Sequence, residues 1–236
     1  MVVRAVFFDW FNTLARYEPP REELHSKLLS EFGVTVSPRD LMPGLLAADR
    51  FYFTDAVRSP WQKRPAEEQA KLYLRYSEIM FGTAGITMEK ELLSQVIRRW
   101  PELQRQMRFN LFDDVLATLD LLKGDRLILG LLTNATREAV AVREKLGLGP
   151  YLSFAVTSEE AGVEKPEPGI FLLALERAGV KASEAVHVGD QYEIDVAGAR
   201  GAGIKPIMID RYDLYPDVKD CPRISSLLDL RAYLQP

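Results

Sequence analysis

The sequence predicts an α/β fold in which a doubly wound parallel sheet carries an inserted helical cap domain. Three features support this prediction. From residue 109 onward, short apolar runs alternate with amphipathic helical segments, which is typical of a parallel sheet covered by helices. Residues 2–9 form one further apolar run. The long stretch between them, residues 15–108, has helical periodicity without strand-like alternation.

The first strand is predicted at residues 2–9 (VVRAVFFD), because a short run rich in β-branched and aromatic residues is typical of a buried strand. Four helices are expected in the insertion that follows. The first ends at Gly33, and the second begins at Ser37-Pro38 with a kink or delay at Pro43. Helical segments are expected at about residues 44–57, 66–80 and 88–100, the last ending before Pro101.

The chain after residue 108 is expected to alternate between helices and strands. Asn110 is predicted to cap a helix with Asp113 and Asp114 in its first turn, and Gly124 ends this helix. Further strands are predicted at residues 127–133, 154–157, 185–188 and 207–209. The helices between them are predicted at 136–146, from Pro168 to Gly179, and at 194–200. The expected domains are a core of residues 1–14 with 109–236, and a helical cap of residues 15–108.

The composition excludes several functional classes. The 236 residues include 34 acidic and 30 basic side chains, and the net charge of −4 argues against binding to a nucleic-acid backbone. No run reaches the roughly 20 apolar residues of a membrane span, and the lone Cys221 cannot form an internal disulfide. The sequence has no Walker A motif and no dinucleotide-binding glycine motif. We therefore expect a cytoplasmic monomer or homodimer whose partner is a small molecule, not nucleic acid or a membrane.

Polar residues gather at the predicted carboxyl ends of the strands, where ligands bind in open α/β sheets. Asp9 ends the first strand, and Thr13 follows it. The residues that follow the later strands are Thr133, Asn134, Lys165, Asp190 and Asp195. This combination is suited to phosphoryl transfer, because a carboxylate can attack phosphorus while an ammonium and a hydroxyl hold the phosphoryl oxygens.

A carboxylate nucleophile needs help against charge repulsion. Two unit charges of the same sign at about 4 Å repel by about 4 kcal/mol at an effective dielectric of about 20. Mg²⁺ offsets this repulsion, and it needs only one or two protein carboxylates beside the oxygens of the substrate. Asp190 can supply the second carboxylate. The sequence therefore favours a site that uses Mg²⁺.

Four segments of the chain resemble, in order, the motifs of the haloacid dehalogenase (HAD) superfamily. They are FFDWFNTL with Asp9, LLTN with Thr133, EKPEPGIF with Lys165, and VGDQYEID with Asp190 and Asp195. Each motif alone is weak, but four in this order over nearly the whole chain are specific. The resemblance implies a Rossmann-like core, a helical cap of the family's first cap class and a phosphatase-like hydrolase activity.

The resemblance also implies a role for each residue. Asp9 would be the nucleophile and would form an aspartyl-phosphate with a small phosphorylated metabolite. Asp9, Asp190 and the backbone carbonyl of Phe11 would hold Mg²⁺, and Asp195 would act through water or by supporting these ligands. The residues implied to bind the phosphoryl group are Thr133, Asn134 and Lys165, of which Thr133 and Lys165 also act in catalysis.

The first motif departs from the phosphatase pattern at two positions. Phe11 stands where the family's phosphatases have the Asp that protonates the leaving group, and Asn12 stands where they have Gly. General acid catalysis contributes about 10²–10⁴-fold to a rate. We therefore expect slow hydrolysis of alkyl phosphates and a preference for good leaving groups, such as those of acyl and aryl phosphates.

The same departure leaves three alternatives. An aromatic residue at Phe11 also resembles the 2-haloacid dehalogenases, in which Asp attacks carbon without metal. Those enzymes typically have a Ser-Ser-Asn motif where this chain has Val188-Gly189-Asp190. The Asp9-Trp10 pair resembles the phosphonoacetaldehyde hydrolases, which need a Schiff-base lysine that no motif identifies here. The third alternative is a catalytically weak binding protein with the same fold. His25 and His187 are interpreted as packing residues.

Overall fold

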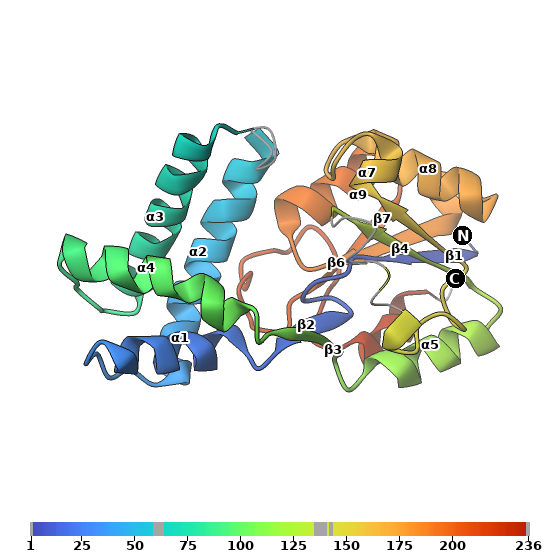
Figure 1. Cartoon of the computed structure of the whole chain (residues 1–236). Coiled ribbons are helices and arrows are strands. Elements are labelled where there is room, and N and C mark those ends of the chain that lie inside the picture. The colour runs from blue at the N-terminus through green and yellow to red at the C-terminus, as the bar shows by residue number, and fades with distance from the viewer. Residues whose placement is uncertain (1, 59–63, 135–140, 142–143, 235–236) are drawn as a thin grey trace. The chain divides into compact units, whose positions relative to one another are not determined.

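The computed structural model describes residues 2–58, 64–134, 141 and 144–234. The chain divides into two compact units (Figure 1), one formed by Met1–Arg16 with Asn110–Pro236 and the other by Tyr17–Phe109. The second unit is therefore an insertion into the first. Its role as a cap over a catalytic unit stays a prediction.

The first unit is built on one parallel sheet of six strands. The strand order is β5-β4-β1-β6-β7-β8, and each neighbouring pair runs parallel. The strands are β1 (Ala5–Phe8), β4 (Ile128–Thr133), β5 (Phe154–Thr157), β6 (Ala185–Gly189), β7 (Lys205–Ile209) and β8 (Arg223–Ile224). Phe8 lies level with Leu131 of β4 and Val188 of β6. The carboxyl ends of these three central strands therefore meet at one edge of the sheet.

Helices cover both faces of this sheet (Figure 1), which confirms the predicted doubly wound α/β fold. The helix α5 (Val115–Gly124) lies on one face. The other face carries α7 (Ser158–Ala161), α8 (Pro168–Ala178) and α9 (Ala197–Gly201). Short helical segments complete the unit: η2 (Ala182–Glu184), the π-helical η3 (Tyr192–Val196) and η4 (Leu227–Tyr233). Fully buried side chains between α8 and the sheet include Phe7, Leu132, Ile170 and Phe171.

The second unit contains four described helices with a core of their own. They are α1 (Arg21–Glu31), α2 (Pro38–Arg58), α3 (Ala66–Thr83) and α4 (Lys90–Gln104). Leu28, Leu41, Leu45 and Met80 are among the buried residues that pack together. Gly44 lets α2 lie directly against α3, because a Cβ atom at this position would be 2.0 Å from the backbone oxygen of Met80. The unit therefore has its own packed interior, as a separate domain does.

Two short strands lie where the chain passes between the units. The strands β2 (Ala15–Glu18) and β3 (Arg108–Leu111) pair in a separate two-stranded sheet. The sequence predicted only helix in residues 15–108, so this prediction was wrong at both ends. Asn110 was predicted to be a helix cap, but it lies in β3, and the following helix begins at Val115. Pairing between segments so far apart in sequence leaves no local signal that could have indicated it.

Several helix boundaries also differ from the prediction. The helix α2 continues through Pro43, and α4 continues through Pro101 to Gln104. A proline inside a helix loses one hydrogen bond and its ring crowds the preceding turn, but the residues around Pro101 are held by Trp100 and Leu103, which are buried in the core of the unit. The helix predicted at residues 136–146 lies mostly outside the described residues. None of the helices in the described ranges is long and apolar enough to cross a membrane.

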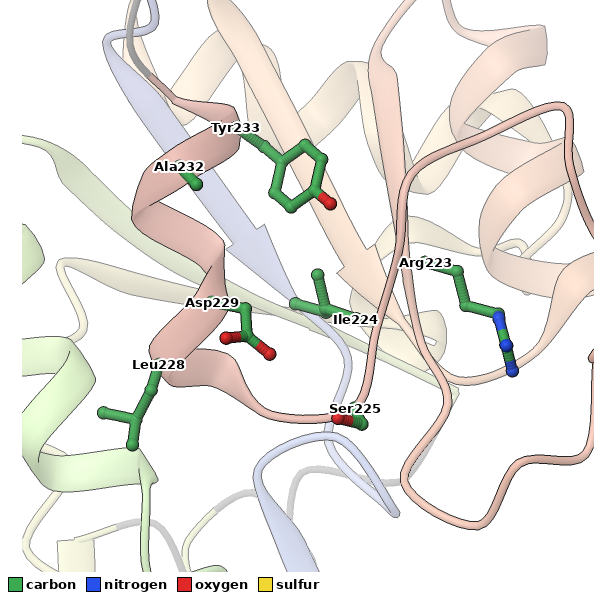
Figure 2. Close-up of a pocket in the computed structure, with 7 residues that line it drawn as sticks. All are labelled: Arg223, Ile224, Ser225, Leu228, Asp229, Ala232 and Tyr233. Atoms are coloured by element: carbon green, nitrogen blue, oxygen red, sulfur yellow. The ribbon is translucent and has the colours of Figure 1, made fainter.

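A pocket of about 450 Å³ lies beside η4 in the first unit (Figure 2). It is lined by residues of β8, the following turn and η4, among them Arg223, Asp229 and Tyr233. Its lining contains none of the strand-end residues predicted from the sequence.

Candidate active site

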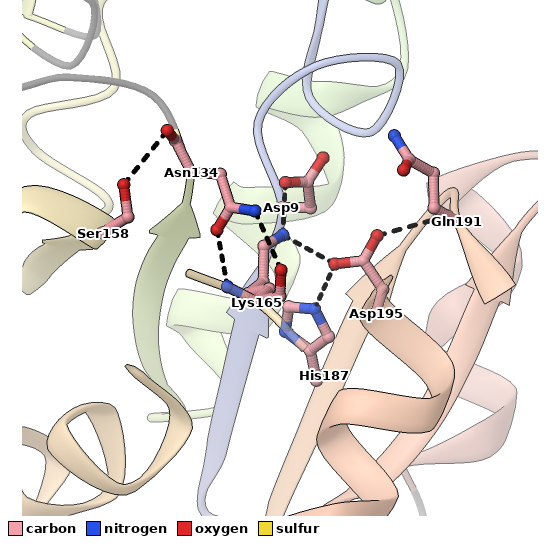
Figure 3. Close-up of polar contacts among 7 residues, drawn as sticks. All are labelled: Asp9, Asn134, Ser158, Lys165, His187, Gln191 and Asp195. Carbon is pink, nitrogen blue, oxygen red and sulfur yellow. Dashed lines mark hydrogen bonds and ion pairs between the residues drawn. The ribbon is translucent and has the colours of Figure 1, made fainter. Parts of the chain in front are cut away.

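Asp9 follows directly after β1, at the carboxyl edge of the sheet. Its backbone N–H donates to the carbonyl of Val188 at 2.8 Å, which continues the ladder between β1 and β6 by one residue. The carboxylate is buried, and its Oδ1 lies 2.6 Å from Nζ of Lys165. Figure 3 shows the two charged groups facing each other beyond the end of the strand. Asp9 is thus held in one position by its backbone and by its partner.

Lys165 is the centre of a buried charge cluster (Figure 3). Its Nζ donates to Oδ1 of Asp9 and to Oδ1 of Asp195, both at 2.6 Å. Its backbone is held by Asn134, whose Oδ1 accepts from the Lys165 N–H at 2.7 Å and whose Nδ2 donates to the Lys165 carbonyl at 3.0 Å. Ser158 Oγ in turn donates to the carbonyl of Asn134 at 3.1 Å. Both polar atoms of the Asn134 amide therefore serve Lys165, which favours a positioning role for Asn134 over direct contact with phosphate.

Asp195 is the second carboxylate bound to Lys165, and both of its oxygens are hydrogen-bonded. Oδ1 contacts Nζ of Lys165 at 2.6 Å and Nε2 of His187 at 2.9 Å, while Oδ2 accepts from the Gln191 N–H at 3.2 Å. Gly189 makes room for this side chain, since a Cβ atom there would be 2.2 Å from Cγ of Asp195. A carboxylate engaged in this way is suited to support other groups of the site and less suited to bind a metal directly.

The third carboxylate is that of Asp190, which follows β6. Its Oδ1 is buried and has no hydrogen-bond partner among the described residues. Buried polar atoms normally have partners, so an atom of this kind needs an explanation such as an ion. One carboxylate oxygen from each of Asp9, Asp190 and Asp195 lies within 4.8 Å of the others. Three carboxylates thus face one ammonium, and the excess negative charge and oxygen ligands suit a hard divalent cation.

The titration of these groups reflects burial and mutual charge. Burial raises the pKa of Asp9 to about 6, although the Lys165 ammonium opposes this rise. Burial, together with the neighbouring charge of Asp9, also raises the pKa of Asp190 well above its usual value. For Asp195, the charges and hydrogen bonds of Lys165 and His187 outweigh burial and lower the pKa. The pKa of Lys165 is raised, because Asp195 and Asp9 outweigh burial, so its ammonium stays charged.

The remaining predicted residues lie at the same edge of the first unit. Thr133 is buried at the end of β4, and Thr13 is buried in the turn after Asp9. The hydroxyl of Thr13 has no partner in the part of the chain that the structure describes. In the same turn, between Asp9 and Thr13, Asn12 has the left-handed backbone value φ 58°, and Phe11 forms a β-bridge with Ala15. The structure therefore places all the predicted polar residues in one unit.

Sequence reasoning missed the link between His187 and Asp195. His187 has no exposed surface and packs edge-on against Phe171, with ring centroids 5.1 Å apart, as expected of a packing residue. Its hydrogen bond to Asp195 was not predicted. The signal was present, because a polar side chain inside an apolar strand needs a hydrogen-bond partner.

A Rossmann-like sheet with a carboxylate after its first strand, a second carboxylate after β6 and a buried lysine is the arrangement expected of the hydrolase class that the four motifs resemble. Residues 3–203 match the family of haloacid dehalogenase-like hydrolases. The chain belongs to this family, as its four motifs indicated.

Two relatives of this chain are a phosphatase and a hydrolase domain-containing protein. The chain is 40% identical to ribulose-1,5-bisphosphate 5-phosphatase of Halopiger xanaduensis over 210 residues, 87% of this chain and 84% of that protein. It is 39% identical to haloacid dehalogenase-like hydrolase domain-containing protein 3 of Danio rerio over 130 residues, 54% of each chain. That match therefore spans about half the length of the relative.

One solved structure that is similar to this chain is a dehalogenase. The 2-haloacid dehalogenase of Pseudomonas syringae pv. Tomato DC3000 is 27% identical, with a TM-score of 0.56 over 99% of this chain and 98% of that one. The family therefore includes both phosphatases and dehalogenases among the relatives of this chain. The choice between them depends on the residues of the site.

Proposed function

We propose that this protein is a Mg²⁺-dependent phosphatase that hydrolyses a small phosphorylated metabolite through an aspartyl-phosphate on Asp9. The observation that supports it most is the arrangement of three carboxylates around the buried ammonium of Lys165. The phosphatase relative from Halopiger xanaduensis, which is 40% identical over 87% of this chain, supports the same class of substrate.

The metal would be held by Asp9, Asp190 and the backbone carbonyl of Phe11. The unpartnered Oδ1 of Asp190 is the atom that most needs such a ligand. Asp195 supports the site from behind, because its oxygens are already engaged by Lys165, His187 and the Gln191 N–H. When bound, the metal supplies charge neutralisation that lets a phosphate dianion approach a carboxylate.

Hydrolysis would proceed in two displacements. An oxygen of Asp9 forms a bond to phosphorus, and the bond from phosphorus to the leaving oxygen breaks. Water then attacks the phosphorus of the aspartyl-phosphate, which releases inorganic phosphate and restores the carboxylate. Lys165 and Thr133 hold the phosphoryl oxygens, and Asn134 keeps the backbone of Lys165 in place.

Phe11 determines which leaving groups are favoured. Its side chain has no proton to donate, so the leaving oxygen departs without help from this position. Acyl and aryl phosphates, whose leaving groups are weak bases, are therefore better substrates than alkyl phosphates. The cap domain, residues 15–108 by the sequence-based boundary, would select the metabolite.

A 2-haloacid dehalogenase is the second candidate, favoured by Phe11 and by the likeness to the Pseudomonas syringae enzyme. That reaction releases halide, which needs no proton. The sequence Val188-Gly189-Asp190 argues against it, because an ionised Asp190 beside Asp9 would repel a haloacid anion unless a metal were bound. Halide release from 2-chloropropionate in EDTA is the result that would favour this candidate over the phosphatase.

The decisive experiment measures phosphate release from p-nitrophenyl phosphate and acetyl phosphate, with Mg²⁺ and with EDTA. Wild type is compared with Asp9→Asn, and with Asp113→Asn as a control at an aspartate whose side chain is 95% exposed. We expect Mg²⁺-dependent turnover that prefers acetyl phosphate, is lost in Asp9→Asn and is unchanged in Asp113→Asn. Failure of the wild type to release phosphate from either substrate with Mg²⁺ would overturn the proposal.

A further inference from the structure

Arg211 lies two residues after β7 and binds the loop that follows Asp9. Its Nη2 donates to the backbone carbonyl of Thr13 at 2.8 Å. Its side chain is only 9% exposed, and the guanidinium lies 3.9 Å from the centroid of the Phe112 ring. The contact joins residues 198 positions apart in the chain.

Asp114 holds the other side of this guanidinium. Its two oxygens accept from Nη1 and Nη2 of Arg211 at 2.9 and 3.0 Å. Its Oδ2 also accepts from Ser226 Oγ at 2.7 Å and from the Leu227 N–H at 2.8 Å. The bidentate pair with Asp114 fixes the plane of the guanidinium, so the second N–H of Nη2 points in a fixed direction, toward the Thr13 carbonyl.

The β1–β2 loop, residues 10–14, contains a residue in an unfavourable backbone conformation. Asn12 takes a left-handed backbone conformation with φ 58°. Within the loop, the Leu14 and Ala15 N–H groups both donate to the Trp10 carbonyl at 3.0 Å, and the Asn12 N–H donates to the Ala15 carbonyl at 2.7 Å. Asparagine tolerates this conformation better than other non-glycine residues do, but it is still less favourable than the right-handed one, so contacts to the loop stabilise it. Arg211 supplies such a contact from outside the loop.

The carbonyl of Thr13 lies close in sequence to Asp9 and Phe11, the residues proposed to attack phosphorus and to bind the metal. Thr13 is two residues after Phe11 and four after Asp9. Thr13 itself has no exposed surface, so its carbonyl depends on a protein partner. A shift of the loop would therefore move the Phe11 carbonyl relative to the Asp9 carboxylate, which β1 and β6 hold in place.

We infer that Arg211, locked by Asp114, is a positioning residue that holds the β1–β2 loop in the conformation that presents the Phe11 carbonyl beside Asp9. The inference rests on the proposed function for its catalytic consequence. The effect on the loop itself does not depend on that function.

Arg211→Met is the test, with Arg223→Met as the matched control. Arg223 lies in β8 and donates to Asp210 at 2.7 Å and to Asp213 at 2.6 Å, so its loss also breaks an arginine–aspartate pair in the same unit. Hydrogen exchange at the amides of Asn12, Leu14 and Ala15 reports on the loop without any activity assay. We expect these amides to exchange about tenfold faster or more in Arg211→Met, and at the wild-type rate in Arg223→Met.

Kinetics give the second measurement. In Arg211→Met we expect kcat for acetyl phosphate to fall by about 10- to 100-fold, with a higher Mg²⁺ concentration for half-activation, because small displacements of catalytic groups are costly. Arg223→Met should retain wild-type kcat and Mg²⁺ dependence. Equal exchange at the three amides in the two variants would overturn the inference, and so would equal kinetic changes.

Two further outcomes stay distinguishable. If Arg211→Met does not fold, Arg211→Lys is measured instead. A lysine keeps the charge against Asp114 but lacks the fork that also reaches Thr13, so faster exchange is expected and wild-type exchange would overturn the inference. If the wild type has no Mg²⁺-dependent phosphatase activity, the proposed function fails, while the exchange comparison still decides whether Arg211 holds the loop.

Discussion

The Nζ of Lys165 lies 2.6 Å from Oδ1 of Asp9, although 156 residues separate them in the chain. Lys165 follows β5, which is separated from β1 by β4, and Asn134 at the end of β4 holds the Lys165 backbone so that its side chain reaches Asp9. Burial raises the pKa of Asp9 and the Lys165 ammonium opposes this rise, which favours the charged carboxylate that the proposed mechanism requires.

Lys165→Met should abolish most of the activity and lower stability. We expect kcat to fall by about 10²–10³-fold, because the charged group proposed to hold the phosphoryl oxygens is lost. Two buried carboxylates also lose their partner, so the free energy of unfolding should fall by about 3–5 kcal/mol in the absence of metal. Lys219→Met, at an exposed lysine that bonds only to the carbonyl of Pro216 among the contacts described, is the control for both assays. Wild-type kcat in Lys165→Met would contradict the assignment.

Gly189→Ala should disturb the site through Asp195. The added Cβ would lie 2.2 Å from Cγ of Asp195, whose carboxylate must then move away from Lys165. Overpacking of this kind costs about 1–3 kcal/mol in unfolding free energy, and the displaced ion pair should lower kcat as well. Gly201→Ala, where an added Cβ meets no atom within 4 Å, should leave kcat unchanged. A urea titration and initial rates with acetyl phosphate give the two quantities, and equal results for the two variants would contradict the prediction.

Acid should weaken the fold through His25 in the helical unit. Burial, followed by the positive charge of Arg21, lowers the pKa of His25 from 6.5 to about 3. The unfolded chain therefore binds this proton at a higher pH than the folded chain does. The stabilising effect is complete above pH 6.5 and is lost as the pH falls toward 3, by about 3–5 kcal/mol over the whole range.

His25→Phe isolates this contribution. The ring of His25 stacks on Trp100 with centroids 3.8 Å apart, and its Nδ1 has no hydrogen-bond partner in the described ranges. Phenylalanine keeps an aromatic ring in this position and does not titrate. Urea unfolding of the full chain at several pH values between 4 and 7 should show a smaller loss of stability in the variant. An unchanged pH dependence would show that other groups control acid unfolding.

Gly44→Ala should separate α2 from α3. The new Cβ would lie 2.0 Å from the backbone oxygen of Met80, and backbone atoms cannot move aside as a side chain can. We expect a loss of about 1–3 kcal/mol in unfolding free energy. Gly82→Ala in α3, where an added Cβ has no atom within 4 Å, should be neutral or stabilise by up to about 1 kcal/mol. Thermal melts of both variants test the contrast, which would be wrong if Gly44→Ala were as stable as Gly82→Ala.

Much of the first unit could be predicted from sequence. The strand ends at Asp9, Thr133 and Asp190 follow from apolar runs that stop at a polar residue, a pattern local enough to recognise. The role of Asn134 could not be predicted, because its partner is the backbone of Lys165, 31 residues away. The pairing of β2 with β3 was equally hidden, since each is only four residues long and pairs with a distant segment.

The same limit applies to helix ends. Pro101 indicates a helix end in isolation, but burial of Leu103 in the core outweighs the one lost hydrogen bond. The π-helical turn at Tyr192–Val196 is also invisible to a periodicity of 3.6 residues. Tertiary contacts determine the local helix geometry in both cases, and a single sequence gives little information about such contacts.

The pairing of β2 with β3 has a consequence for how this protein can change. The chain leaves the first unit and returns to it through two hydrogen-bonded neighbours, so the insertion begins and ends at adjacent points. A different segment of any length could be spliced in there without altering the strand order of the sheet. The helical unit can therefore be replaced as a module. Mutations within it leave the residues at the carboxyl edge of the sheet unchanged.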